Sequence, residues 1–265
     1  MKKLGILAGA GRFPVILAEA ARKQGKETVV IGLEGSEPSL EKIANAFYQA
    51  KSGELERVIG IFNLNDVTEV VMAGKVDRKL ALAPENLDAR AKQALSRMKD
   101  MGDNAILVAL AGELASAGIK VEEATQFLKP LLAPSGVLGK CSPDARMQKD
   151  IDFGFRLAKE TGKLDIGQAI VVKNLSVVAI EALEGTDETI RRAGKLAGHG
   201  TVVIKVCKPG QDTRFDLPAV GAGTIRTMKE AGASCLAVEA GRTVFLDKEE
   251  TIAVADFAGI SIVGK

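Results

Sequence analysis

The 265-residue sequence has a single histidine, His199. Ser-His-Asp triads and Cys-His pairs each need a placed histidine, and zinc proteases and most two-metal phosphoesterases need several. His199 follows a helical pattern and precedes Gly200, where the helix dipole favours a histidine with a structural role. Chemistry in this protein is therefore expected to depend on carboxylates, lysines, arginines and backbone amides.

Aromatic residues, cysteines, excess charge and long apolar runs are scarce as well. The chain has no tryptophan, one tyrosine and a net charge of +2, which gives neither a base-stacking surface nor an electrostatic footprint for nucleic acid. Its three cysteines lack C-x-x-C spacing and are expected to pack as small apolar residues. Since no apolar run is long enough to span a bilayer and no signal peptide is visible, the expected location is the cytoplasm.

Alternating apolar runs and helical patterns predict an α/β protein with two lobes. The first lobe, residues 1–134, is expected to be Rossmann-like, with a parallel sheet. Its expected strands are Lys3–Ala8, Thr28–Leu33, Arg57–Phe62 and Glu69–Val76, and its expected helices are Phe13–Gln24, Asn86–Met101 and Asn104–Ala117. Three prolines and two glycines in Lys129–Pro143 mark the boundary between the lobes.

The second lobe, residues 140–265, is expected to be a separate α/β unit with its own core. Ser142 and Pro143 have the residue types of a helix N-cap and a first helical position. The expected helices are Pro143–Glu160, Thr186–Leu196, Gly221–Ala231 and Glu249–Ala258. The expected strands are Gln168–Lys173 and Ser176–Ala182, which form a hairpin, then Thr201–Cys207, Ser234–Glu239, Thr243–Leu246 and Ser261–Val263.

Three segments have residues suited to binding phosphate. Glycines at Gly9 and Gly11, between a strand and a helix, let backbone amides face an anion, as at the start of a dinucleotide fingerprint. Glu34 has roughly the position of a ribose-binding acid, but Pro14 replaces the third glycine, so a plain tight turn is the alternative. At Gly185–Glu188, Thr186 can cap a helix, and the same amides and hydroxyl can contact a phosphate.

The third segment is the polar loop that follows the strand Thr201–Cys207. Asp212 and Asp216, four residues apart, can converge on one Mg²⁺ ion, which prefers one or two carboxylates together with water and substrate phosphate. Arg214, Lys205 and Lys208 can neutralise phosphate charge nearby. The alternative is a solvated loop without a catalytic role.

These segments together resemble the His-poor, non-calcineurin-like family of UDP-2,3-diacylglucosamine pyrophosphatases of the lipid A pathway. The resemblance covers essentially the whole chain, and the block from Gln211 to Pro218 is its most specific part. The other matching segments are Gly9–Pro14, Ala73–Val76, Glu184–Glu188 and Ala237–Gly241.

This resemblance implies a metal-dependent hydrolase that cuts UDP-2,3-diacylglucosamine to UMP and 2,3-diacylglucosamine 1-phosphate (lipid X). It implies Mg²⁺ or another divalent cation, a nucleotide-linked glycolipid as substrate, and peripheral contact with the inner membrane as an open possibility. An aspartate of the Gln211–Pro218 block is implied to be essential, and it can be either Asp212 or Asp216. Arg214 is expected to stabilise the transition state electrostatically. If both aspartates prove dispensable, Glu181, Glu184, Asp187 and Glu239 are the next candidates. The expected substrate contacts are Gly9, Gly11, Arg12, Phe13, Lys75, Gly185, Thr186, Asp187, Lys205, Lys208, Gln211 and Thr213.

Two other functions stay open on the sequence. Gly9, Gly11 and Glu34 are also compatible with a nucleotide-dependent oxidoreductase. A protein that binds a nucleotide sugar without turning it over would use the same phosphate contacts.

Overall fold

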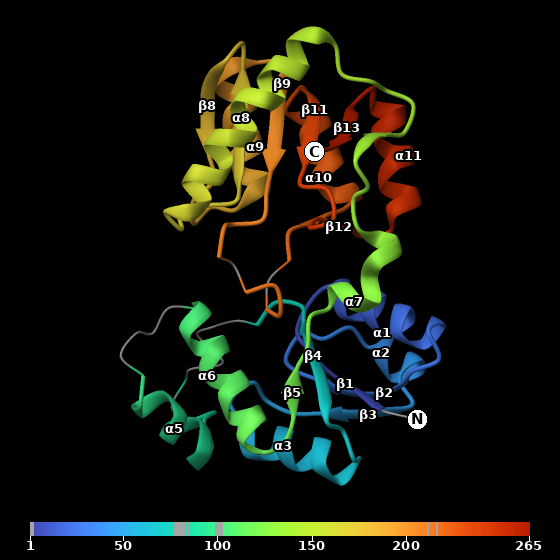
Figure 1. Ribbon diagram of the computed structural model, residues 1–265, viewed down its shortest axis with the longest axis vertical. Helices are drawn as coiled ribbons and strands as arrows, with labels where there is room; N and C mark the ends of the chain where they lie inside the picture. Colours follow the sequence, from blue (N-terminus) through green and yellow to red (C-terminus); the bar gives the residue numbers. More distant parts are fainter. Residues whose placement is uncertain (1–2, 77–82, 84, 99–102, 211, 216) are drawn as a thin grey trace. The chain divides into compact units, whose positions relative to one another are not determined.

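The computed structural model describes residues 3–76, 83, 85–98, 103–210, 212–215 and 217–265 (Figure 1). Internal contacts divide the chain into two compact units. The N-terminal unit is Met1–Leu128 together with Asp212–Asp216, and the C-terminal unit is Lys129–Gln211 together with Leu217–Lys265. The predicted class is confirmed, since a parallel sheet lies in the first unit and a separate mixed sheet in the second.

The N-terminal unit is built on a parallel sheet with the order β3-β2-β1-β4-β5. Its strands are β1 Lys3–Ala8, β2 Glu27–Gly32, β3 Ala46–Gln49, β4 Glu69–Ala73 and β5 Lys120–Val121. Burial is nearly continuous along the central strands, without alternation, because helices cover both faces of a parallel sheet. The sequence analysis did not identify the short strands β3 and β5.

The helices of this unit are α1 Phe13–Lys23, α2 Leu40–Ile43, α3 Leu55–Leu64, α5 Ala89–Ser96, α6 Asp103–Ser116 and α7 Thr125–Leu128. The predicted strand Arg57–Phe62 is wrong, because those residues lie in α3. The buried residues of α3 are Leu55, Val58, Ile59 and Phe62. Their spacing of three and four is the period of a helix with one buried face, whereas a strand would alternate every second residue.

The C-terminal unit has a mixed six-stranded sheet with the order β6-β13-β11-β9-β7-β8. Its strands are β6 Gly136–Leu138, β7 Ala169–Lys173, β8 Ser176–Ile180, β9 Thr201–Lys205, β11 Ala233–Val238 and β13 Ser261–Gly264, and a small second sheet pairs β10 Ala219–Val220 with β12 Val244–Phe245. Strands β9, β11 and β13 run parallel, while β6 and β7 run antiparallel to their neighbours. The predicted hairpin is confirmed, and its turn residues Asn174 and Leu175 both have positive φ.

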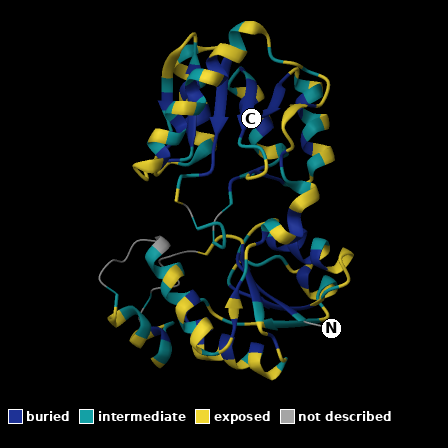
Figure 2. Ribbon diagram, in the orientation of Figure 1, coloured by how far each residue is buried: buried dark blue, intermediate teal, exposed yellow. Residues whose placement is uncertain are grey.

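Helices cover both faces of this sheet. They are α8 Ala145–Lys163, α9 Thr186–Ala197, α10 Ala222–Glu230 and α11 Lys248–Ala258, after the short 3₁₀ turn η1 Lys129–Leu131. Helix α8 packs in one hydrophobic cluster, whereas α9, α10 and α11 share another, so the sheet is buried between two layers (Figure 2). The predicted cap Ser142 is wrong. Asp144 is the N-cap of α8, and its carboxylate accepts a hydrogen bond from the Met147 amide at 2.7 Å.

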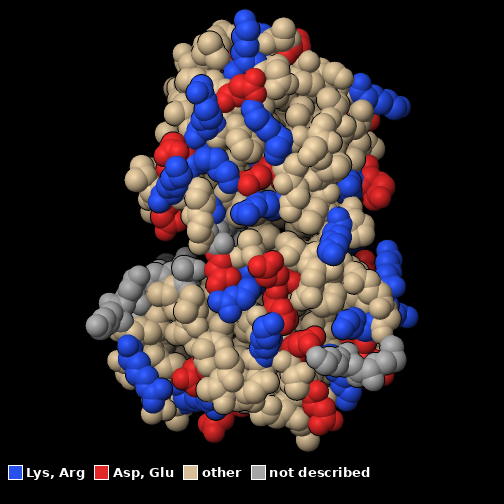
Figure 3. Space-filling model, in the orientation of Figure 1, with Lys and Arg blue, Asp and Glu red and all other residues tan. Residues whose placement is uncertain are grey.

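The visible face of the surface is mixed in charge. On the face shown in Figure 3, Lys and Arg side chains are interspersed with Asp and Glu. None of the helices that the structure describes is both long enough and apolar enough to cross a membrane.

Candidate functional site

The carboxyl edge of the N-terminal sheet carries the first group of predicted site residues. Strand β1 pairs with β2 on one side and with β4 on the other, so the strand order reverses between β1 and β4. Open α/β sheets bind ligands outside the carboxyl ends of the strands at such a reversal. Gly9–Arg12 follows β1 and Gly74–Lys75 follows β4, which places both segments at this point.

Backbone hydrogen bonds join these two segments. The Gly9 amide donates to the Ala73 carbonyl at 2.8 Å, and Ala10 and Lys75 exchange hydrogen bonds of 2.7 and 2.9 Å. A Cβ on Gly9 would stand 2.4 Å from the Lys75 carbonyl oxygen, so only glycine permits this approach. Gly9 thus positions the turn, and its amide is already used within the fold.

Gly11, by contrast, faces open space. Its φ is +95°, and a Cβ built there would meet no atom within 4 Å. Arg12 follows as the N-cap residue of α1, with Phe13 and Pro14 in the first turn. Gly11 and Arg12 therefore remain the candidates in this segment for contact with an anion, since they lie where the N-terminus of α1 meets the reversal of strand order.

Glu34, the basis of the oxidoreductase hypothesis, has a structural task. Its carboxylate accepts the Ser52 amide at 3.0 and 3.2 Å and also the Ser52 hydroxyl. These bonds hold the chain just beyond β3. To bind a ribose, Glu34 would have to give up its hydrogen bonds to Ser52.

The polar loop Asp212–Asp216 belongs to the N-terminal unit, although the sequence places it in the C-terminal lobe. The Thr213 hydroxyl donates to a Glu123 oxygen at 2.6 Å, and Phe215 packs against the hydrophobic cluster of the N-terminal unit. Glu123 lies two residues beyond β5, the neighbour of β4. The loop therefore lies at the same carboxyl edge as Gly9–Arg12 and Lys75.

Asp212 and Arg214 form a close ion pair in this loop. Arg214 Nε lies 2.9 Å from Asp212 Oδ1, and Arg214 Nη2 lies 2.6 Å from Oδ2. The Arg214 side chain holds the pKa of the Asp212 carboxyl below its ordinary value, while the carboxylate raises the pKa of Arg214. Asp212 is thus a weak proton acceptor, better suited to holding a cation than to serving as a general base.

The predicted convergence of Asp212 and Asp216 lies outside the described residues, as does Gln211, because neither Asp216 nor Gln211 is among them. Within the part of the chain that the structure describes, no group of three or more His, Cys, Asp or Glu side chains could hold a metal ion. Both Asp212 oxygens accept hydrogen bonds from Arg214. The described residues therefore do not form a preassembled metal centre.

The C-terminal unit brings together Thr186 and Lys205, which are 19 residues apart. Lys205 ends β9 with its side chain buried, and its ammonium donates to the Thr186 hydroxyl at 3.2 Å and to the Ala219 carbonyl at 3.0 Å. The Thr186 hydroxyl in turn donates to Glu181 at 2.8 Å. A chain from the buried Lys205 ammonium through the half-buried Thr186 hydroxyl to the buried Glu181 carboxylate thus lies beside the first turn of α9.

The prediction that Thr186 caps α9 is wrong. Gly185 is the N-cap, with a φ of +81° that favours glycine, and Thr186 is the first helical residue. Its hydroxyl is directed to Glu181 rather than to the helix amides. Asp187 is exposed in the first turn of the helix.

Two other predicted residues have partners or positions that the sequence did not indicate. The Lys208 ammonium pairs with Asp165 at 2.7 Å, at the turn between α8 and β7. Glu239, a reserve candidate, accepts the Lys159 ammonium at 2.6 Å and the Cys207 amide at 2.9 Å. Glu239 thereby fixes the start of the loop that leads to Asp212.

Burial raises the pKa of Cys207, which fits a small packed residue rather than a nucleophile.

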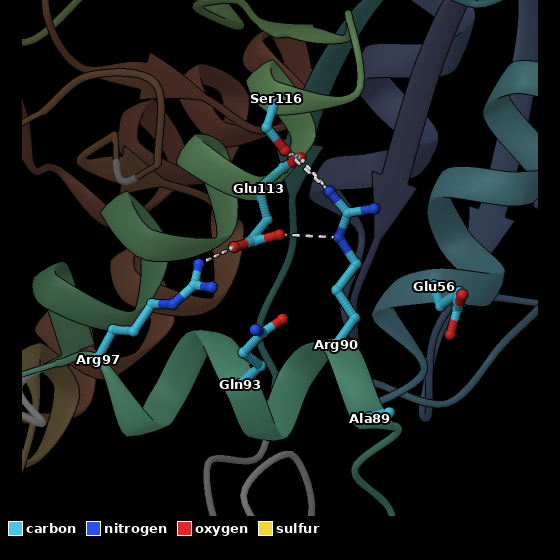
Figure 4. A pocket seen from close by; sticks show the side chains of 7 residues that line it. All are labelled: Glu56, Ala89, Arg90, Gln93, Arg97, Glu113 and Ser116. Atoms are coloured by element: carbon cyan, nitrogen blue, oxygen red, sulfur yellow. Dashed lines mark hydrogen bonds and ion pairs between the residues drawn. The ribbon is translucent and has the colours of Figure 1, made fainter.

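An open hollow of about 660 Å³ lies elsewhere in the N-terminal unit (Figure 4). Arg90 of α5 reaches across it to Glu113 of α6, with Nε 2.8 Å from the carboxylate, and Arg97 approaches the same carboxylate at 3.7 Å. The other lining residues are Glu56, Ala89, Gln93 and Ser116. None of the predicted site residues that the structure describes is among these lining residues.

Comparisons with known proteins match the whole chain. The model of the LpxI N-terminal domain matches residues 3–131, and that of the LpxI C-terminal domain matches residues 134–263. A curated relative, the UDP-2,3-diacylglucosamine pyrophosphatase LpxI of Caulobacter vibrioides, is 34% identical over 275 residues. The match covers 100% of this chain and 98% of the relative.

Solved structures resemble the chain only weakly. A UDP-glucose-4-epimerase from Stenotrophomonas maltophila, with bound NAD and a UDP-sugar, is 19% identical. The match covers 45% of this chain and 35% of that one, with a TM-score of 0.31. The N5-carboxyaminoimidazole ribonucleotide synthetase of Thermotoga maritima is 16% identical, with coverages of 69% and 42% and a TM-score of 0.26. At these scores neither structure supports an argument about function.

Proposed function

The chain belongs to the LpxI family, and from that membership we propose that it hydrolyses the diphosphate of UDP-2,3-diacylglucosamine in lipid A synthesis. Water adds across one P–O bond of the anhydride, and the products are UMP and 2,3-diacylglucosamine 1-phosphate. The proposal depends on the end-to-end match to a relative named as a UDP-2,3-diacylglucosamine pyrophosphatase, because that match includes both family domains.

In this proposal the Asp212–Arg214 pair acts on the diphosphate. Arg214 stabilises the charge that develops on the phosphate oxygens, and Asp212 orients the guanidinium through the two hydrogen bonds described above. The pair lies at the edge of the sheet where Gly11, Arg12 and Lys75 can receive a phosphate or the nucleotide.

Lys205, Thr186 and Gly185 are proposed to bind substrate from the C-terminal unit. The buried ammonium is fixed by Thr186 and Ala219, so its charge is preorganised rather than mobile. Glu181 completes this arrangement by accepting the Thr186 hydrogen. Asp187, Lys208, Thr213 and Phe13 remain predicted contacts.

A divalent cation, Mg²⁺ in the simplest case, is proposed as cofactor. The described side chains do not preassemble its site, so the cation is expected to arrive with the diphosphate and to use Asp212, Asp216 or both as protein ligands. When bound, it would neutralise charge on the phosphate oxygens. The residues themselves hold and orient the substrate.

The test is hydrolysis of UDP-2,3-diacylglucosamine by the purified protein, with UMP and the lipid 1-phosphate measured by mass spectrometry. Turnover is expected with Mg²⁺, lost with EDTA and restored by excess Mg²⁺. Isotopically labelled water identifies the attacked phosphorus, because the label appears in only one product. Binding of the substrate without turnover under all metal conditions would contradict the proposal and favour a non-catalytic nucleotide-sugar-binding protein.

We also propose that the enzyme works against the inner membrane from the cytoplasm, because its proposed substrate carries two acyl chains. Flotation with vesicles that contain the substrate, compared with vesicles that lack it, tests this. Protein that stays at the bottom of the gradient in both cases would contradict membrane contact without affecting the proposed reaction.

A further inference from the structure

The chain makes a short excursion between its two units at the proposed catalytic loop. Residues up to Gln211 and from Leu217 belong to the C-terminal unit, whereas Asp212–Asp216 belong to the N-terminal unit. The loop follows Cys207, whose amide is fixed by Glu239 at 2.9 Å. A loop fixed only at that end would leave the Asp212–Arg214 pair without a defined position on the N-terminal unit.

Glu123 provides an attachment on the N-terminal unit. One of its oxygens accepts the Thr213 hydroxyl at 2.6 Å, and the other accepts the Thr125 hydroxyl at 3.1 Å. Thr125 is the first residue of α7, so the carboxylate has one partner on that helix and another on the loop. Each carboxylate oxygen of Glu123 thus has a different partner, which orients the carboxylate toward the Thr213 hydroxyl.

Two further contacts link this attachment to the Asp212–Arg214 pair. Phe215 packs against the hydrophobic cluster of the N-terminal unit, and the Arg214 guanidinium lies 4.9 Å from the centre of the Phe215 ring. The charge of Glu123 also contributes to the raised pKa of Arg214. Glu123 therefore acts on the loop through a hydrogen bond to Thr213 and on Arg214 through its charge.

We propose that Glu123 is a positioning residue for hydrolysis, which docks the loop on the N-terminal sheet and so sets the place of the Asp212–Arg214 pair. This inference rests on the proposed function, since it assigns the pair to the diphosphate. Glu123 itself acts through Thr213 and is not assigned any contact with the reacting atoms. Loss of the attachment should lower kcat while KM changes little, because Arg214 is proposed to act on charge that develops in the transition state.

The experiment is a double-mutant cycle on the full-length protein with UDP-2,3-diacylglucosamine and Mg²⁺. Glu123→Ala and Thr213→Val should each lower kcat roughly three- to tenfold, the equivalent of one hydrogen bond. The double variant should fall no further than Glu123→Ala, because Thr213→Val removes a bond that Glu123→Ala has already removed. Thr213→Ser keeps the hydroxyl and should retain most of the wild-type kcat. Glu123→Gln keeps an acceptor but removes the charge, so it separates the two effects.

Glu122→Ala is the matched control. Its carboxylate is the immediate neighbour of Glu123 and pairs with Lys120 at 2.6 Å rather than with the loop. Hydrogen exchange of the peptide that contains residues 212–215 gives a readout independent of turnover. Exchange there should accelerate in Glu123→Ala and Thr213→Val, but not in Glu122→Ala.

Three results would overturn the inference: equal kcat in Glu123→Ala and Glu122→Ala, single-variant losses that multiply in the double variant, or unchanged exchange of the loop. If the wild-type protein binds the substrate but never hydrolyses it, the proposed function fails instead. The exchange comparison then still decides whether Glu123 docks the loop.

Discussion

Replacing Asp212 by asparagine removes the charge from the Asp212–Arg214 pair while keeping the shape of the side chain. In the wild-type protein the carboxylate accepts hydrogen bonds from Arg214 Nε on Oδ1 and from Arg214 Nη2 on Oδ2. Asparagine offers one acceptor oxygen and turns an amide donor toward the guanidinium, so the two-point hold on Arg214 is lost. Loss of one preorganised charge-stabilising group typically lowers kcat by about 10²–10³, and we expect an effect of this size.

The same change should have little effect on the stability of the folded state. The Arg214 side chain is 38% exposed, so solvent screens the pair, and such pairs contribute about 1 kcal/mol or less. For a chain of this size that corresponds to a shift of roughly 2–4 °C in Tm at most. A large loss of kcat with a small loss of Tm is therefore the expected signature of Asp212→Asn.

Steady-state hydrolysis and thermal unfolding of the same preparations measure the two effects. Asp152→Asn is the matched control. The Asp152 carboxylate also pairs with a basic side chain, that of Lys265, and its pKa is likewise lowered, but Asp152 lies on α8, outside the proposed site. The control should keep wild-type kcat. If Asp212→Asn retained more than about a tenth of wild-type kcat, a loss smaller than that of one such group, the role given to the pair would be refuted.

Three other predictions concern pH, binding and packing. The pKa of Asp212 is lowered, so the ion pair is intact above the ordinary carboxyl pKa of about 4 and is lost only as pH falls through a still lower value. The kcat/KM profile should therefore show no Asp212-dependent limb near neutral pH, and such a limb would contradict this assignment. Thr186→Val should raise KM by up to about tenfold, the value of one hydrogen bond, because Lys205 loses its hydroxyl partner; unchanged KM would return Thr186 to a structural role. Gly9→Ala should lower Tm markedly, since its Cβ would stand 2.4 Å from a carbonyl oxygen. Gly60→Ala, in an open position of α3, should instead stabilise the folded protein by roughly 0.5–1 kcal/mol. Chemical denaturation of both variants measures the two effects.

The sequence predicts most of the fold because its strands and helices have clear periodicity. Its main error, at Arg57–Phe62, comes from a run of apolar residues too short to separate a strand from a buried helix. Strand β5 has only two residues, and its pairing with β4 depends on the sheet rather than on local preference. Such an element has no local signal that a pattern could detect.

The sequence indicates some of the residues of the candidate site and misses others, for a similar reason. Lys205, Asp212 and Arg214 follow from the polar residues after a strand, and Thr186 follows from the start of a helix; the structure gives each of them a polar partner. Glu123 does not follow, because it comes after the undetected strand β5 and meets Thr213 across 90 positions of sequence. Had β5 been identified, the rule that carboxyl ends of parallel strands meet at one edge would have indicated it.

The crossing of the chain at Asp212–Asp216 limits how relatives of this protein can exchange parts. A chimera joined near Leu128 takes Glu123 from one parent and Thr213 and Phe215 from the other, although a join there separates the two units everywhere else. A split into two polypeptides at the same place would leave Phe215 without its hydrophobic partners until the fragments met. Recombination and fragment complementation in this family should therefore succeed when the docking partners are inherited together, even though they stand in different domains of the linear sequence.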